Sequence, residues 1–170
     1  MKRAFFRAII ILLMTKQVVG QNKNEINLQT SVNRAQKLLN EGDSLNQIDI
    51  KNAIAVYTKL VEMTKNEKEG EINFYYYLAL SQRAASKENL SDHYGAIKDV
   101  ELAQIVELSS SYTKYNYIER DNLKNRRGMN YFTLGLAQCK IGNKKEGCLN
   151  LSKAGEFNFD SYSVIQKYCQ

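Results

Sequence analysis

The sequence predicts an all-α fold, and three observations support this class. The 170-residue chain contains no Pro and only 9 Gly, so nothing interrupts helices and few tight turns are available for a β-sandwich. Apolar residues recur three and four positions apart, for example at Ile97, Val100, Ala103 and Leu108, which is the spacing of one helix face. Strict apolar–polar alternation is absent over any useful length, so strands are not predicted. The length suggests one domain or a small repeat array.

The first twenty residues have the pattern of a secretory signal peptide. A positive segment is followed by a continuous apolar run over residues 8–14, which is too short to span a bilayer, since spanning takes roughly 20 residues. The positive residues are Lys2, Arg3 and Arg7. Val18 and Gly20 suit signal peptidase at −3 and −1, so we expect a cut before Gln21. The alternative is an uncleaved helix or membrane anchor.

Cleavage would leave residues 21–170 as a periplasmic or secreted domain, in an oxidising compartment and without stable membrane insertion. It would also remove four basic residues from a region that contains no acidic one, Lys2, Arg3, Arg7 and Lys16. The net charge of +6 therefore falls to near balance, and nucleic-acid binding is not predicted. A small basic cluster at Lys124, Arg126 and Arg127 reads as a solvated helix face, because Glu119 and Asp121 lie close by.

The first predicted unit covers residues 26–66. Its first helix runs from Ile26 to Glu41, with three residues facing inward: Val32, Ala35 and Leu39. A turn over residues 42–48 leads to a second helix that contains Asn52 to Leu60.

The second predicted unit covers residues 72–109. Its first helix carries Tyr75, Leu78, Ala79 and Gln82, and its second carries Ala96, Val100 and Ala103. A five-residue insertion relative to the next unit is placed in a polar turn over residues 87–94.

The third predicted unit covers residues 128–159. Its first helix carries Tyr131, Leu134, Gly135 and Gln138, and its second carries Gly147, Leu151 and Ala154, with Gly142 in the turn. The preceding stretch, Ser109 to Arg127, is expected to extend the neighbouring helices, because Tyr112, Tyr115, Ile118 and Leu123 are spaced accordingly. In the remaining segment, 160–170, a last helix from Ser161 to Tyr168 is predicted to face the previous hairpin through Val164, Ile165 and Tyr168.

The third unit resembles the tetratricopeptide repeat (TPR). The family pattern has a large aromatic, Leu-Gly and Tyr on the first helix, then a small residue, a large apolar residue and Ala on the second. In this resemblance the hairpin helices approach closely where Gly135 meets Gly147, and no side chain would fit there. The departures are Gln138 for Tyr, Phe159 near the usual Pro, and Gln36 at the small position of the first unit.

The resemblance implies a right-handed superhelix of about three helical hairpins, with the last helix as a cap. The signal peptide and the C-terminal segment are similar to those of exported TPR proteins of Bacteroidetes-type bacteria. The same resemblance makes the cap and the last hairpin neighbours, and it implies a disulfide between Cys148 and Cys169. Three buried, reduced thiols are the alternative.

The function implied by the resemblance is a non-enzymatic scaffold that binds a protein or peptide in a concave groove. The groove positions carried over are Asn73, Tyr76, Leu80 and Arg83 in the second unit, and Met129, Phe132, Leu136 and Lys140 in the third. This set suits an amphipathic or acidic peptide, whereas the Lys/Asn clamp for a terminal carboxylate is not reproduced. The alternative is a structural subunit of an envelope or secretion assembly that docks permanently through its convex face or its first repeat.

Catalytic chemistry, cofactors and metals are not predicted. His93, the only histidine, is expected in a solvent-exposed loop, and no nucleophile or second base is signalled near it. The three cysteines include no Cys-x-x-Cys pair and have no zinc-ligand spacing. An enzyme would have to use Cys139 or His93.

In the run of three tyrosines, Tyr75 is expected in the core and Tyr76 on the groove side, because a helix turns about 100° per residue.

Overall fold

The computed structural model describes residues 26–67, 70–109 and 120–170. Every regular element in these ranges is a helix, so the all-α class is confirmed. The described residues divide into two units, with the boundary between Arg34 and Ala35. The predicted signal peptide over residues 1–20 and its cleavage site lie outside the described ranges. Among the described helices, none has the length and apolar character that crossing a membrane requires.

The first hairpin joins a helix over residues 26–45 to α2 (Ile50–Thr64). The first helix is longer than predicted, because Gly42 stays helical and leaves room for the ring of Tyr57. A Cβ on Gly42 would lie 2.8 Å from Cδ1 of that ring. The turn is therefore shorter than the predicted 42–48 and ends at Asp49, whose carboxylate accepts a hydrogen bond from the amide of Asn52 at 3.1 Å.

The second hairpin consists of α3 (Gly70–Asn89) and α4 (His93–Ser109). The polar turn predicted over residues 87–94 is wrong, because the inserted residues lengthen α3 and the turn occupies only 90–92. Asp92 then starts α4 by accepting a hydrogen bond from the amide of Gly95 at 3.0 Å.

The third hairpin consists of α5 (Arg120–Lys140) and α6 (Lys144–Glu156), and its helices meet at the predicted glycines. A Cβ on Gly135 would lie 2.7 Å from the carbonyl oxygen of Gly147, and one on Gly147 would lie 2.8 Å from that of Gly135. Gly142 has φ +91° in the turn, a conformation that favours glycine. The predicted helical extension before residue 128 is confirmed from residue 120 onward, while Tyr112, Tyr115 and Ile118 lie outside the described residues.

The last helix, α7 (Tyr162–Tyr168), packs against α6 and matches the predicted cap to within one residue. The preceding Ser161 is buried, and its hydroxyl donates a hydrogen bond to the carbonyl oxygen of Leu151 at 2.9 Å.

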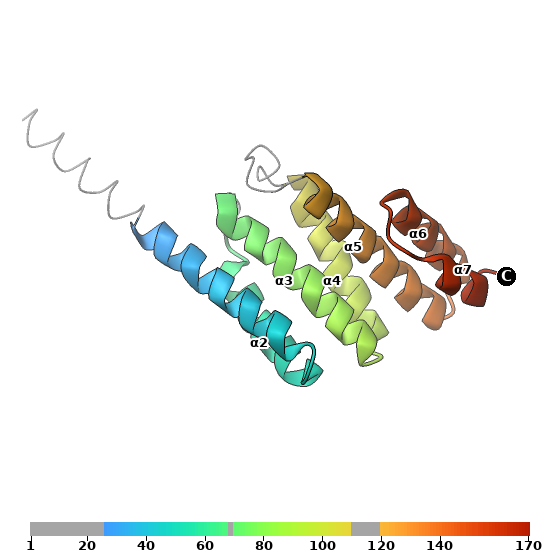
Figure 1. Ribbon diagram of the computed structural model, residues 1–170, viewed down its shortest axis with the longest axis horizontal. Helices are drawn as coiled ribbons and strands as arrows, with labels where there is room; N and C mark the ends of the chain where they lie inside the picture. Colours follow the sequence, from blue (N-terminus) through green and yellow to red (C-terminus); the bar gives the residue numbers. More distant parts are fainter. Residues whose placement is uncertain (1–25, 68–69, 110–119) are drawn as a thin grey trace, which may run out of the picture. The chain divides into compact units, whose positions relative to one another are not determined.

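Figure 1 shows that α3, α4, α5 and α6 lie side by side in chain order. One core cluster joins three of these helices, through Ala84 of α3, Val100 of α4 and Leu134 of α5.

Candidate functional site

Most side chains at the groove positions predicted in the second hairpin are buried inside the protein. Asn73, Tyr76 and Leu80 expose only 4%, 9% and 0% of their surface. The physical reason is that α3 contacts α2, α4 and α5, so little of its circumference is left for solvent. An apolar strip open to a peptide is therefore not formed by Tyr76 and Leu80. This corrects the sequence-based prediction for these positions.

Arg83 was also predicted to line the groove, but it is part of a buried ion-pair cluster. Its Nε and Nη2 donate to the two carboxylate oxygens of Asp99 at 2.8 and 2.7 Å, and its Nη1 donates to the hydroxyl of Thr58 at 3.3 Å. Lys87 contacts the same carboxylate, with its Nζ 2.9 Å from Oδ2 of Asp99. Arg83 thus ties α3 to α2 and α4 and does not supply a charge for orienting a peptide.

The groove positions predicted in the third hairpin keep more of their surface. Met129, Phe132 and Leu136 are half-buried, and Lys140 is exposed. The ring of Phe132 lies against that of Phe159, with centroids 5.1 Å apart. Lys140 also pairs with a carboxylate of α3. Phe132 and Lys140 are thus partly engaged by other residues of the protein.

That carboxylate belongs to the buried Glu88, which is at the centre of a second ion-pair cluster. One of its oxygens, Oε1, accepts from Nζ of Lys140 at 2.5 Å, and the other lies 2.6 Å from Nδ1 of His93. His93 is therefore not a solvent-exposed loop residue, as predicted, but the first residue of α4, held against α3. With both oxygens of Glu88 engaged, the cluster joins α3, α4 and α5.

The three consecutive tyrosines also differ from the prediction, which placed only Tyr75 in the core. Tyr75, Tyr76 and Tyr77 are all buried, so core packing accounts for three rings rather than one. Tyr77 is enclosed completely, and its hydroxyl accepts a hydrogen bond from Nδ2 of Asn130 on α5 at 3.2 Å. Burial raises the pKa of the Tyr76 phenol, and the Asp99 and Glu62 carboxylates add to the rise. Tyr76 is thus a core residue.

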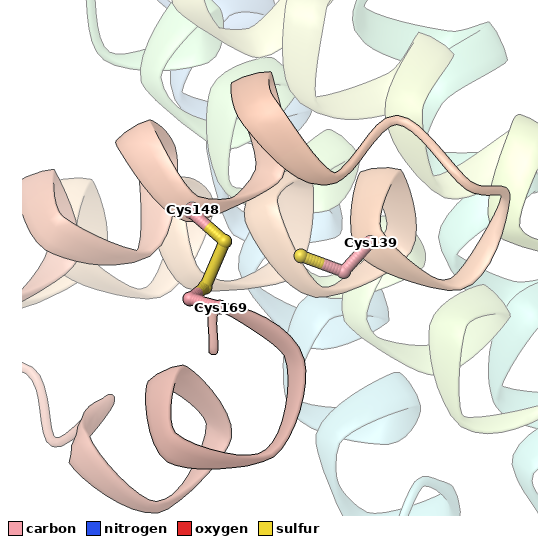
Figure 2. Close-up of side chains that lie close together, drawn as sticks. All are labelled: Cys139, Cys148 and Cys169. Carbon is pink, nitrogen blue, oxygen red and sulfur yellow. A yellow bond between two sulfur atoms is a disulfide. The ribbon is translucent and has the colours of Figure 1, made fainter.

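All three cysteines of the chain converge at one point between α5, α6 and the end of α7 (Figure 2). The structure joins Cys148 to Cys169 in a disulfide with Cα atoms 5.7 Å apart. Cys139 is a free, buried thiol, and the three sulfur atoms all lie within 4.8 Å of one another. Burial raises the pKa of the Cys139 thiol, and the nearby Lys144 opposes the rise. With the disulfide formed, only Cys139 could supply a thiolate to a metal ion.

A cavity of about 380 Å³ between α4 and α5 was not predicted. Tyr131 and Phe157 stack beside it, with ring centroids 5.5 Å apart and ring planes 7° apart. Glu107 and Arg127, which form an ion pair, also line it. Among the residues that the structure describes, the lining is Gln104, Glu107, Arg127, Asn130, Tyr131 and Phe157. The sequence offered no signal for it, because Phe157 follows the third unit's consensus positions and its partner ring lies 26 positions earlier.

Large apolar side chains are exposed on the second helices of the hairpins, a face that contributed no residue to the predicted groove. Tyr94 and Ile105 of α4 expose 73% and 61% of their surface, and Leu149 of α6 exposes 50%. This is the face through which the alternative structural role would operate.

Comparisons with protein-family models, with curated proteins and with solved structures found no match to this chain. Its function is therefore inferred from the residues and the geometry described above.

Proposed function

We propose that the chain is a non-enzymatic, protein- or peptide-binding scaffold of the TPR type that works in the bacterial cell envelope. The observation that carries the proposal is the succession of helix hairpins, the third of which has glycines at the close contact that the TPR pattern requires. Stacked hairpins of this kind provide an extended surface for a partner. The signal-peptide pattern of residues 1–20 supports export to the periplasm or beyond.

The engagement of both candidate catalytic side chains supports a binding role over an enzymatic one. Cys139 is buried and its pKa is raised, which lowers the fraction present as the nucleophilic thiolate. His93 is held against Glu88. Cys139 is therefore shielded from a substrate in solution, and His93 is engaged in pairing within the fold.

The surface of the third hairpin is where the proposed scaffold would bind a peptide. Met129 and Leu136 retain accessible apolar area, and Lys140 places a cation at the end of the same helix. An amphipathic peptide would match this apolar area, and an acidic residue on it would have to share Lys140 with Glu88. The second hairpin would contribute little, because its groove positions are buried.

A second candidate function is a structural subunit of an envelope or secretion assembly. Tyr94, Ile105 and Leu149 favour it, because they expose large apolar area on the second helices. A permanent subunit would cover these side chains with its neighbour, and alone it would be expected to self-associate.

The two roles are separated by capture from an envelope extract of the source bacterium, using the wild type, Leu136→Asp and Ile105→Asp. The scaffold role predicts that Leu136→Asp loses the captured protein and that Ile105→Asp retains it. The reverse result would support the structural subunit. Analytical ultracentrifugation of the purified chain provides the matched test, with a monomer expected for the scaffold.

A further inference from the structure

The three cysteines are the only ones in the chain, yet they come from three different elements and meet at one point. A structural disulfide needs only two of them. In Figure 2 the sulfur of Cys139 points toward the Cys148–Cys169 bond. All three sulfur atoms lie within 4.8 Å of one another, so a small displacement brings the free thiol into contact with the disulfide.

We propose that this cluster is a thiol–disulfide exchange site, in which Cys139 is the internal nucleophile and Cys169 is the leaving group. Cys139 loses its proton to solvent, and its thiolate attacks Sγ of Cys148. A Cys139–Cys148 bond forms as the Cys148–Cys169 bond breaks, and the Cys169 thiolate takes up a proton. The chain as a whole is neither oxidised nor reduced, so no external oxidant is needed.

Packing determines which sulfur is attacked. Cys139 lies on α5 directly against α6: a Cβ on Gly147, the neighbour of Cys148, would be 2.8 Å from the amide nitrogen of Cys139. The product bond would therefore lie within a hairpin that is already closely packed. Cys169, by contrast, follows the seven-residue helix α7, which has no fully buried residue. Release of Cys169 requires the least rearrangement of the fold.

Exchange would have two consequences for the molecule. It would remove the covalent tether between α7 and α6, leaving the cap held by non-covalent contacts such as the Ser161 hydrogen bond to Leu151. It would also replace a buried thiol with a half-buried one at Cys169, which a thiol-modifying reagent or a small-molecule disulfide can reach. The cluster thereby controls whether the chain presents a reactive thiol.

The rate of exchange should depend on pH in a defined direction. Burial raises the pKa of the Cys139 thiol, so little thiolate is present at neutral pH and its fraction grows as the pH rises. While most of the thiol stays protonated, the exchange rate should increase about tenfold per pH unit, in proportion to the thiolate fraction.

Peptide mapping of the full chain tests the proposal. Trypsin separates the three cysteines onto different peptides, because cleavage sites at Lys140, Lys145 and Lys167 lie between them. The native chain is incubated without reductant at neutral and alkaline pH, quenched with acid, alkylated with N-ethylmaleimide and digested. The expected result is conversion of Cys148–Cys169 peptides into Cys139–Cys148 peptides with alkylated Cys169, faster at higher pH. A chain that keeps only Cys148–Cys169 throughout, or that forms Cys139–Cys169, overturns the proposal.

Three variants complete the experiment. Cys139→Ser removes the nucleophile, so its Cys148–Cys169 bond should persist at every pH and no alkylated Cys169 should appear. Cys169→Ser retains only Cys139 and Cys148, and oxidised glutathione should join these two cysteines in a disulfide. The matched variant Cys148→Ser retains Cys139 and Cys169, and oxidised glutathione should join these far more slowly. Circular dichroism checks that each variant is folded. If a variant is not folded, mapping of the native chain still decides.

Discussion

The second and third hairpins have first helices of similar length, 20 and 21 residues, but are held together by different interactions. In the second hairpin, α3 and α4 are joined by two buried carboxylates, Asp99 and Glu88, each contacted by two cationic or imidazole groups. In the third, α5 and α6 touch backbone to backbone at Gly135 and Gly147, and a disulfide fastens the adjoining cap. The two hairpins therefore differ in the kind of change that they cannot tolerate.

The ion-paired hairpin should be sensitive to losing a group, because a buried charge left without its partner is costly. The glycine-packed hairpin should be sensitive to gaining atoms, because backbone at a close contact cannot move aside as a flexible side chain can.

The largest effect is expected for Asp99→Ala in the second hairpin. Asp99 is buried and shared by Arg83 and Lys87, so its removal leaves both cations without their carboxylate. Breaking a buried pair costs about 3–5 kcal/mol, measured as a lower free energy of unfolding in urea. Glu101→Ala, an exposed change on the same helix, is the control and should be nearly silent. Equal effects of the two changes would mean that the cluster does not hold the hairpin.

Gly147→Leu should be the next most damaging change. The added side chain would meet the backbone of α5 at Gly135 and Cys139, and overpacking in a core costs up to about 3 kcal/mol. Lys145→Leu introduces the same side chain at an exposed position of α6 and should change the free energy of unfolding little. If both variants melt at the same temperature, the close contact between α5 and α6 is not present in solution.

Reduction of the disulfide should have a smaller effect. The bond closes a loop between residues 21 positions apart, for which about 2–4 kcal/mol is typical. We expect about 2 kcal/mol, at the lower end of that range, because α7 has no fully buried residue and can detach without opening the core. The measurement is Tm with and without a dithiol reductant. The double variant Cys148→Ser, Cys169→Ser is the control, and its Tm should not respond to the reductant.

The smallest effect is expected for Gln138→Ala. The Oε1 of Gln138 accepts a hydrogen bond from Nδ2 of Asn150 on α6 at 2.8 Å. Asn150 is buried, so loss of its acceptor should cost about 1 kcal/mol in urea unfolding. Gln166→Ala breaks an exposed hydrogen bond to Tyr162 and should have no measurable effect. A silent Gln138→Ala would show that water replaces the lost acceptor.

The third hairpin could be predicted from the sequence more accurately than the second. Gly135, Gly142 and Gly147 lie within thirteen consecutive positions, and each has a local reason to be glycine, so their helices and turn could be placed correctly. In the second hairpin, the inserted residues could equally lengthen a turn or a helix, and the choice depended on partners for Lys87 and Glu88 on α4 and α5. Periodicity along one segment does not contain that information.

The burial of the groove positions in the second hairpin could not be predicted for a related reason. These positions were transferred from a helix with one free face, whereas α3 is covered by α2, α4 and α5. Tyr76 and Leu80 are buried by residues distant in the sequence, and Arg83 finds its partner Asp99 on the next helix. The pairing of Cys148 with Cys169 followed from expecting the last hairpin and the cap to be neighbours, whereas the convergence of Cys139 on the same point was visible only in the structure.

Native-state hydrogen exchange with and without a dithiol reductant tests most directly whether the hairpins are held by separate interactions. With the disulfide reduced, the amides of α7 and the adjacent part of α6 should lose protection, while those of α3 and α4 should keep it. Asp99→Ala should give the opposite pattern, with protection lost first in α3 and α4. Uniform loss of protection across α3 to α7 in both experiments would contradict this, because it would show that the helices unfold as one cooperative unit and that neither hairpin is stabilised separately.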